Sequence, residues 1–387
     1  MKRLLGIVLG VAAVGLAVIA PASSQTKTPK LATQIYIGNY GAKWAYDFAD
    51  VDPANGLYLL TDRDSKGLDV IDIKHSKIAY QVTGFTGNKG KPEISGPNGV
   101  FVIPGTTTAY ASDVNSVKVV DLATQKIVKS IPTNTSGNRT DGGCYDPVDK
   151  VSVWALGDDD PPSIAVISTV SQSVIGRLTM AGADGVEGCT YEPLTKRFYV
   201  DIPSDKTHPG GAVDIFNPTD LLAGKVQVEK SIALDGCKPT GNVVGPTLNG
   251  APQLGISCDP TDGGKDGDPI FSLVMNLQNY SVTKIPQVGG SDEVAYSPKT
   301  NQYYFAARNW YKSGKTNVGP KLAVLGVVDA GTNSTPPAWV ENIPTCSPDA
   351  KGGCTSGAHS VAVDPVSGRI FVPIGGVSAA RINVYSE

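Results

Sequence analysis

The stretch His359-Ser360-Val361-Ala362-Val363-Asp364-Pro365 contains the pattern that decides the fold. A polar residue precedes a short apolar segment, and a proline ends that segment six positions after the polar residue. We call these two positions the frame residue and the frame proline. Repeats of short strands every 40 to 50 residues or so are typical of β-propellers. The spacing occurs at seven places: Asp47 and Pro53, Asn98 and Pro104, Asp141 and Pro147, Glu187 and Pro193, Thr240 and Pro246, Asp292 and Pro298, and His359 and Pro365.

The second repeat shows how one blade is built. Strands are expected over 99–103, 109–112, 117–122 and 127–131, and four antiparallel strands make one propeller blade. The last repeat supplies only three strands, whereas the segment 33–38 lies ahead of the first repeat without a partner. Pairing this segment with the last repeat would close the ring and remove two exposed sheet edges. We therefore expect an all-β fold, a seven-bladed β-propeller in which an N-terminal strand closes the last blade, as one domain over residues 25–387.

The N-terminus has the organisation of a secretory signal peptide. A basic start precedes an apolar run over 4–20, and small residues follow it around Ala22. We assign residues 1–24 to this signal peptide. The alternative is a membrane anchor, but the run is short of the roughly 20 apolar residues that a span needs. The expected location is periplasmic or secreted, with no membrane span in the mature chain.

Composition narrows the class of protein further. The net charge of -3 provides no basic surface for nucleic acid. Six cysteines in an exported chain indicate disulfides, whereas a metal–thiolate site would need close cysteine pairs that are missing here. Positions within the repeats favour three pairs: Cys144 with Cys189, Cys237 with Cys258, and Cys346 with Cys354.

Two family resemblances add expectations about fold and chemistry. The segment 110–121, followed by Lys126-Ile127-Val128, resembles the YVTN repeat of bacterial exported propellers, which implies the fold and little about activity. The steps Asn98-Gly99, Asp141-Gly142 and Glu187-Gly188 are similar to the N-G, D-G and E-G steps of the SMP-30/gluconolactonase family. In that family the amide or acidic residue binds a divalent metal in the channel. The resemblance implies a hydrolase acting on a small lactone-like substrate, although the family spreads these steps around a six-bladed ring and here they fall on consecutive repeats.

The frame residues are expected to meet at one mouth of the central channel, because the innermost strands of a propeller run beside it. Carboxylates that lie close together oppose one another's ionisation unless a positive charge intervenes. A divalent cation would supply that charge, and oxygen ligands favour Ca²⁺, with Mg²⁺, Mn²⁺ or a transition metal as alternatives. The alternative interpretation is that these polar residues cap strand ends beside a water-filled channel. The expected metal ligands are Asn98, Asp141, Glu187 and Asp292.

Other residues near the mouth receive expected roles. Asp47 or His359 would act as the catalytic base, and the alternative for His359 is a hydrogen-bonded channel residue. A rim made of Arg139, Lys238 and Arg308 would contact the substrate.

The leading hypothesis is a monomeric, metal-dependent propeller hydrolase with a small-molecule substrate. The alternative is a non-catalytic exported propeller that binds a ligand or protein partner and holds a structural metal in its channel. The sequence contains no serine-hydrolase elbow, zinc-protease motif, Walker loop or dinucleotide fingerprint.

Overall fold

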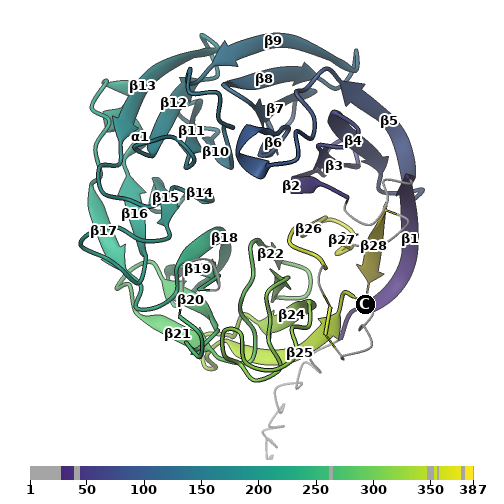
Figure 1. Cartoon of the computed structure of the whole chain (residues 1–387), viewed down its shortest axis with the longest axis vertical. Coiled ribbons are helices and arrows are strands. Elements are labelled where there is room, and N and C mark those ends of the chain that lie inside the picture. Colours follow the sequence, from purple (N-terminus) through teal and green to yellow (C-terminus); the bar gives the residue numbers. More distant parts are fainter. Residues whose placement is uncertain are drawn as a thin grey trace, which may run out of the picture.

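The computed structural model describes residues 28–38, 44–260, 265–346, 353–354, 357–375 and 380–386. The signal peptide assigned to residues 1–24 lies outside the described residues. Within them the strands form seven four-stranded antiparallel sheets, arranged as blades around a central axis (Figure 1). The expected all-β, seven-bladed propeller is thus confirmed.

Each of the first six blades uses four consecutive strands. The first has β2 (Tyr46–Asp52), β3 (Leu57–Asp62), β4 (Gly67–Asp72) and β5 (Lys77–Thr83), and the second β6 (Val100–Val102), β7 (Thr108–Asp113), β8 (Ser116–Asp121) and β9 (Lys126–Pro132). The third has β10 (Gly143–Asp146), β11 (Val151–Leu156), β12 (Ser163–Ser168) and β13 (Ser173–Thr179), and the fourth β14 (Cys189–Glu192), β15 (Arg197–Ile202), β16 (Ala212–Phe216) and β17 (Lys230–Ala233). The fifth has β18 (Pro239–Leu248), β19 (Ala251–Cys258), β20 (Ser272–Asn276) and β21 (Val282–Ile285), and the sixth β22 (Val294–Ser297), β23 (Gln302–Ala307), β24 (Val324–Asp329) and β25 (Ala338–Pro344).

The described helices are short, η1 (Pro92–Ile94) and α1 (Pro218–Leu222), and none of them is long and apolar enough to cross a membrane.

The seventh blade is completed from the other end of the chain. Its strands β26 (Ala362–Val363), β27 (Ile370–Ile374) and β28 (Ala380–Ser386) are joined by β1 (Lys30–Gly38) on the outside. Strand β1 runs antiparallel to β28, from Lys30 opposite Ser386 to Gly38 opposite Ala380. Ile35 and Ile37 of β1 are buried in the core between the seventh and first blades. This pairing agrees with the closure expected from the sequence.

Except for Pro246, which lies within β18, the frame prolines lie where the innermost strand of a blade turns back into the second strand. In the third blade, the carboxylate of Asp146 accepts a hydrogen bond from the Val148 amide (2.8 Å) across Pro147, and Lys150 closes the turn with a φ of 56°. Proline presets the φ of such a turn, and an aspartate caps it. Proline is tolerated at this point because the innermost strand is a sheet edge and loses no ladder hydrogen bond. Equivalent left-handed residues are found at Gly56, Lys196, Asn301 and Gly368.

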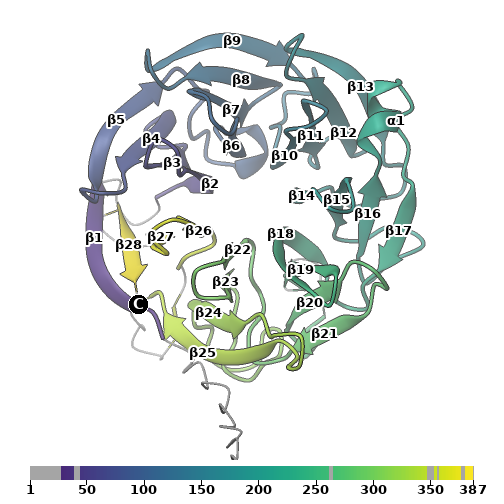
Figure 2. The same ribbon diagram turned by 180° about the vertical axis from the view of Figure 1, so that it is seen from behind.

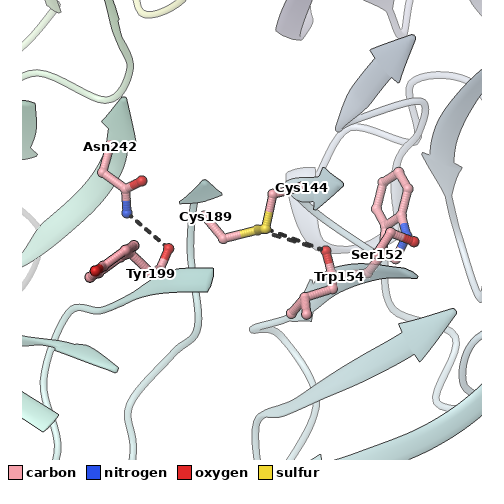
Figure 3. The surroundings of a disulfide bond; sticks show 7 residues. Cys144, Ser152, Trp154, Cys189, Tyr199 and Asn242 are labelled. Atoms are coloured by element: carbon pink, nitrogen blue, oxygen red, sulfur yellow. Dashed lines mark hydrogen bonds between the residues drawn. A yellow bond between two sulfur atoms is a disulfide. The ribbon is translucent and has the colours of Figure 1, made fainter. Parts of the chain in front are cut away.

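Packing between blades forms the core, since each hydrophobic cluster joins side chains of neighbouring sheets. Val153 of the third blade and Phe198 of the fourth, for example, are fully buried in one cluster. The same two blades are linked by the Cys144–Cys189 disulfide between β10 and β14, with a Cα–Cα distance of 5.6 Å (Figure 3). The other disulfides join Cys237 to Cys258 and Cys346 to Cys354, so all three pairs match those expected from the sequence.

Candidate functional site

The innermost strands β2, β6, β10, β14, β18, β22 and β26 surround the centre of the ring (Figure 2). Frame residues of several blades are linked there by shared side-chain contacts. We call the place where these contacts lie the mouth of the channel. The side chains there come from the starts of the innermost strands and from the ends of the second strands, because the second strand of each blade runs back toward the mouth.

Arg63 joins the first two frame residues. Its guanidinium forms an ion pair with the Asp47 carboxylate and donates to the Asn98 amide oxygen from Nε (2.9 Å) and Nη2 (2.6 Å). The Asn98 Nδ2 group donates to the carbonyls of Ser95 (3.0 Å) and Thr140 (3.2 Å). Asn98 is fully buried, and its amide oxygen already accepts two hydrogen bonds.

Arg139 contacts three carboxylates. Its Nη2 lies 2.6 Å from Asp141 Oδ2, its Nε 2.7 Å from Asp158 Oδ2, and its Nη1 3.4 Å from Asp47 Oδ2. Burial lowers the pKa of Arg139, but the charges of Asp141, Asp47 and Asp158 outweigh it and raise that pKa. The guanidinium is therefore a fixed positive charge between carboxylates from the first and third blades.

Asp292, Arg308 and His359 form a third group. Asp292 Oδ2 lies 3.0 Å from Arg308 Nη2 and 3.0 Å from His359 Nδ1. The other ring nitrogen of His359, Nε2, lies 3.1 Å from the Tyr46 carbonyl oxygen, and Nδ1 also lies 3.4 Å from Arg308 Nη1. Burial raises the pKa of Asp292, but Arg308 and His359 outweigh it and lower that pKa below its usual range.

Asp141 and Glu187 differ from the other acids of the mouth. Burial raises the pKa of Asp141 to about 7, despite the opposing charge of Arg139. Burial and then the charge of Asp141 hold the pKa of Glu187 well above its usual range. Asp141 Oδ1 is buried without a hydrogen-bond partner in the described part of the chain, and the Glu187 residue is half-buried.

Acidic groups outnumber basic groups at the mouth. The described residues there include five carboxylates and three guanidinium groups, and burial makes each uncompensated charge costly. The carboxylates belong to Asp47, Asp141, Asp158, Glu187 and Asp292, and the guanidinium groups to Arg63, Arg139 and Arg308.

The frame residue of the fifth blade and the three residues expected at the substrate rim have contacts of their own. Thr240 turns its hydroxyl onto the neighbouring blade, donating to the carbonyls of Ser291 (2.9 Å) and Asp292 (3.0 Å). Lys238 lies in the turn before β18, where its backbone amide donates to the Gly210 carbonyl (3.0 Å). The two arginines expected at the substrate rim, Arg139 and Arg308, are held in ion pairs with frame residues.

The sequence patterns did not predict Arg63 and Asp158 as residues of the mouth. For Arg63, its position in the repeat was an available signal. Arg63 and Arg308 each directly follow the second strand of their blade, since β3 ends at Asp62 and β23 at Ala307. That position lies beside the start of the innermost strand: the Arg63 amide donates to the Ala45 carbonyl (2.9 Å). Extending the repeat alignment to this position would have placed both arginines at the mouth.

The fit of a metal ion is partial. Among the described residues, no group of three or more His, Cys, Asp or Glu side chains is arranged to hold a metal. The amide oxygen of Asn98 is bound by Arg63, and the Oδ2 atoms of Asp141 and Asp292 are paired with Arg139 and Arg308. Asp141 Oδ1 is buried without a hydrogen bond in the described part of the chain. The metal therefore stays a prediction.

Comparison with known proteins supports the fold alone. No protein-family model matches the chain, and no curated protein has a similar sequence. Among solved structures, hydrazine synthase of Kuenenia stuttgartiensis superposes with a TM-score of 0.62 over 89% of this chain and 96% of that chain, at 13% sequence identity. At this identity the similarity shows a shared propeller architecture. The YVTN and SMP-30/gluconolactonase resemblances remain unconfirmed.

Proposed function

We propose that the chain is an exported propeller that binds a divalent cation at its channel mouth and hydrolyses a small lactone-like substrate there. The observation that carries the proposal is the excess of acidic groups over basic groups at the mouth, where Asp141 Oδ1 is buried without a hydrogen bond to any described residue. A cation relieves such an excess without a change in the fold. Three disulfides support export, because they persist in oxidising compartments.

Asp141 and Glu187 would hold the cation. Carboxylate oxygens suit Ca²⁺ first, and also Mg²⁺ or Mn²⁺. Arg63 binds the amide oxygen of Asn98, and Arg308 and His359 hold Asp292 through Oδ2, so we place these two outside the ligand set. A cation bound at the mouth would polarise the carbonyl oxygen of a substrate.

The chain's own groups would orient the substrate and move protons. Arg308 is the most accessible arginine of the mouth, with 42% of its side chain exposed, and so can contact an anionic part of a substrate. Asp47 and His359 remain our proposed bases. Both ring nitrogens of His359 already have polar partners, Asp292 and Arg308 at Nδ1 and the Tyr46 carbonyl at Nε2, so a substrate would have to displace one of these contacts.

A non-catalytic exported propeller that binds a ligand at the same mouth is the second candidate. It is favoured by the engagement of both proposed bases, since Asp47 is paired with Arg63 and Arg139, and His359 with Asp292. Side chains that are fixed by such ion pairs are better suited to a rigid binding surface than to proton transfer. Hydrolytic turnover separates the two candidates.

The test combines metal content with turnover. Protein purified without chelator is examined by elemental analysis, titrated calorimetrically with Ca²⁺, Mg²⁺ and Mn²⁺, and assayed against a panel of lactones. Glu187→Gln and Asp141→Asn should each weaken cation binding at least about tenfold, because each removes one charged ligand. Glu229→Gln, an exposed acid paired with Arg197, is the matched control and should bind the cation normally.

The outcomes separate the parts of the proposal. Unchanged cation affinity in both mouth variants contradicts the cation site. Cation binding by the parent protein without turnover of any lactone favours the non-catalytic candidate. Turnover that persists in EDTA would contradict a metal-dependent reaction.

A further inference from the structure

Below the mouth, the channel contains a separate cavity of about 480 Å³. Residues from all seven blades line it, from Phe48 in the first to Val361 in the seventh. None of the seven frame residues is among its described lining residues, whereas three frame prolines, Pro104, Pro147 and Pro193, are. The cavity therefore lies on the proline side of the mouth, and its volume is in the range of small-molecule sites.

Aromatic side chains form much of the wall on one side. Phe48, Phe101, Tyr145 and Tyr191 line the cavity from four consecutive blades. The rings of Phe101 and Tyr145 are stacked, with centroids 5.4 Å apart and planes 10° apart. The Cys144–Cys189 disulfide lies in the same wall and ties two of these blades together (Figure 3). Such a rigid aromatic wall suits a flat apolar group, and the faces of aromatic rings also attract cations.

The charged side chains that line the cavity are all acidic. They are Asp50 and Glu293, and no Lys, Arg or His is among the described lining residues. Asp50 is already engaged, since its oxygens accept from the amides of Val51 (2.8 Å) and Val102 (2.8 Å). The acidic lining therefore favours a cationic ligand over an anionic one.

Glu293 provides a specific attachment point. It is 6% exposed, and its Oε2 accepts a hydrogen bond from the Ser360 hydroxyl (2.9 Å). Its other oxygen, Oε1, is buried and has no hydrogen-bond partner in the described part of the chain. Buried polar atoms are nearly always satisfied in folded proteins, so an unpaired acceptor beside a cavity indicates a donor supplied by a ligand.

We propose that this cavity is a second binding site, which takes a small protonated aromatic amine. The ring of the ligand lies against Phe101, Tyr145 and Tyr191, and its ammonium group donates to Glu293 Oε1. The site shares no lining residue with the set proposed to hold the cation at the mouth, so it does not depend on the proposed function.

Phenethylamine, 2-phenylethanol and 3-phenylpropionate are suitable probes, because they share one ring and differ in charge. Isothermal titration calorimetry at neutral pH measures their binding to the full folded protein. We expect phenethylamine to bind at least about tenfold more tightly than the alcohol, and the carboxylate to bind more weakly than either. Equal affinities for the amine and the alcohol, or no binding of the amine at millimolar concentration, would overturn the proposal.

Variants locate the binding event. Glu293→Gln should lower the affinity for phenethylamine at least about tenfold and leave that for the alcohol nearly unchanged, because it removes charge and keeps shape. Glu187→Gln changes the mouth and should leave the amine affinity intact. An equal loss in both variants would assign the amine to the mouth and overturn the proposal.

A third variant covers the case in which Glu293→Gln fails to fold. Thr190 lines the cavity and is half-buried, so Thr190→Phe adds volume inside the cavity without touching Glu293. Binding of the amine and of the alcohol should both be lost in this variant, with the circular dichroism spectrum unchanged. Binding of the amine at the parent affinity would place it outside the cavity.

Discussion

Arg139 shows how a single side chain can hold the mouth together. Its guanidinium contacts the carboxylates of Asp47, Asp141 and Asp158, and only 16% of the side chain is exposed. A buried charge network is sensitive to the loss of one member, because the remaining charges stay buried without compensation.

Replacing this residue should therefore be strongly destabilising. Arg139→Met is expected to lower the free energy of unfolding by about 3–5 kcal/mol, the range for breaking a buried ion pair. Arg197→Met is the matched control: its pair with Glu229 is more exposed, and its loss should change stability by about 1 kcal/mol or less. Urea denaturation of both variants measures the difference. Similar, small losses in the two variants would show that the mouth network contributes little to stability.

We expect the burial of Asp50 to make the free energy of unfolding depend on pH. Burial raises its pKa from 3.8 to about 6 in the folded protein, although hydrogen bonds from the amides of Val102 and Val51 oppose the shift. An acid with a raised folded pKa stabilises the fold below its unfolded pKa, and this contribution is lost as pH rises. Stability from Asp50 should thus decline between about pH 4 and pH 6, by at most about 3 kcal/mol.

Asp50→Asn should flatten this part of the stability–pH profile. Denaturation midpoints measured from pH 4 to pH 7 in parent and variant provide the comparison. The same slope in both proteins would show that Asp50 titrates at its ordinary pKa.

The roles of single residues were only partly predictable from sequence. The repeat register identified Asp47, Asp141, Glu187, Asp292 and His359, because a side chain at the start of an innermost strand must face the channel. It did not identify their partners. Arg63 reaches Asp47 from the end of the second strand, and such a contact depends on side-chain reach and on the distance between blades, neither of which a repeat pattern contains.

At the scale of elements, strand positions were more predictable than site chemistry. The strand expected over 117–122 is β8, Ser116–Asp121, and the one expected over 127–131 is β9, Lys126–Pro132. Alternating side chains and tight turns determine such segments locally. Strand β18 shows the limit: it continues through its frame proline to Leu248, with a register shift between Val244 and Thr247. The fifth blade thus differs from the others in that its innermost strand does not end at the frame proline. Its frame residue, Thr240, also brings no carboxylate to the mouth.

The disulfide between innermost strands should contribute more to stability than the one within the loop. Cys144 and Cys189 are 45 residues apart, and Cys346 and Cys354 only 8. In the chain-entropy account the longer loop yields about 4 kcal/mol and the shorter one about 2.5 kcal/mol. Replacing each pair by alanines and measuring unfolding in guanidinium compares them. A larger loss for the Cys346–Cys354 pair would contradict the entropic explanation.

For the whole molecule, the ring geometry places different chemistry at two levels of one channel. Frame residues supply charge at the mouth, whereas residues further along the same strands supply aromatic rings and the Glu293 acid to the cavity. Both sites need every blade in place, because each is built from side chains of several sheets. Closure of the ring therefore controls the sites as well as the fold.

The strand that closes the ring offers a direct test of this coupling. Ile35 of β1 is 4% exposed and lies against the seventh and first blades, whereas its neighbour Tyr36 is 59% exposed. Ile35→Ala should cost about 2–5 kcal/mol, the range for truncating a buried isoleucine, and Tyr36→Ala about 0.5 kcal/mol or less. Because β1 alone holds the outer edge of β28, loosening it should also weaken ligand binding at the cavity as the protein is heated. Thermal unfolding measures the loss of stability, calorimetric titration with phenethylamine at increasing temperature measures the binding, and amide hydrogen exchange of β28 reports the local opening. Unchanged exchange in β28 of the Ile35 variant would show that the ring stays closed without this contact.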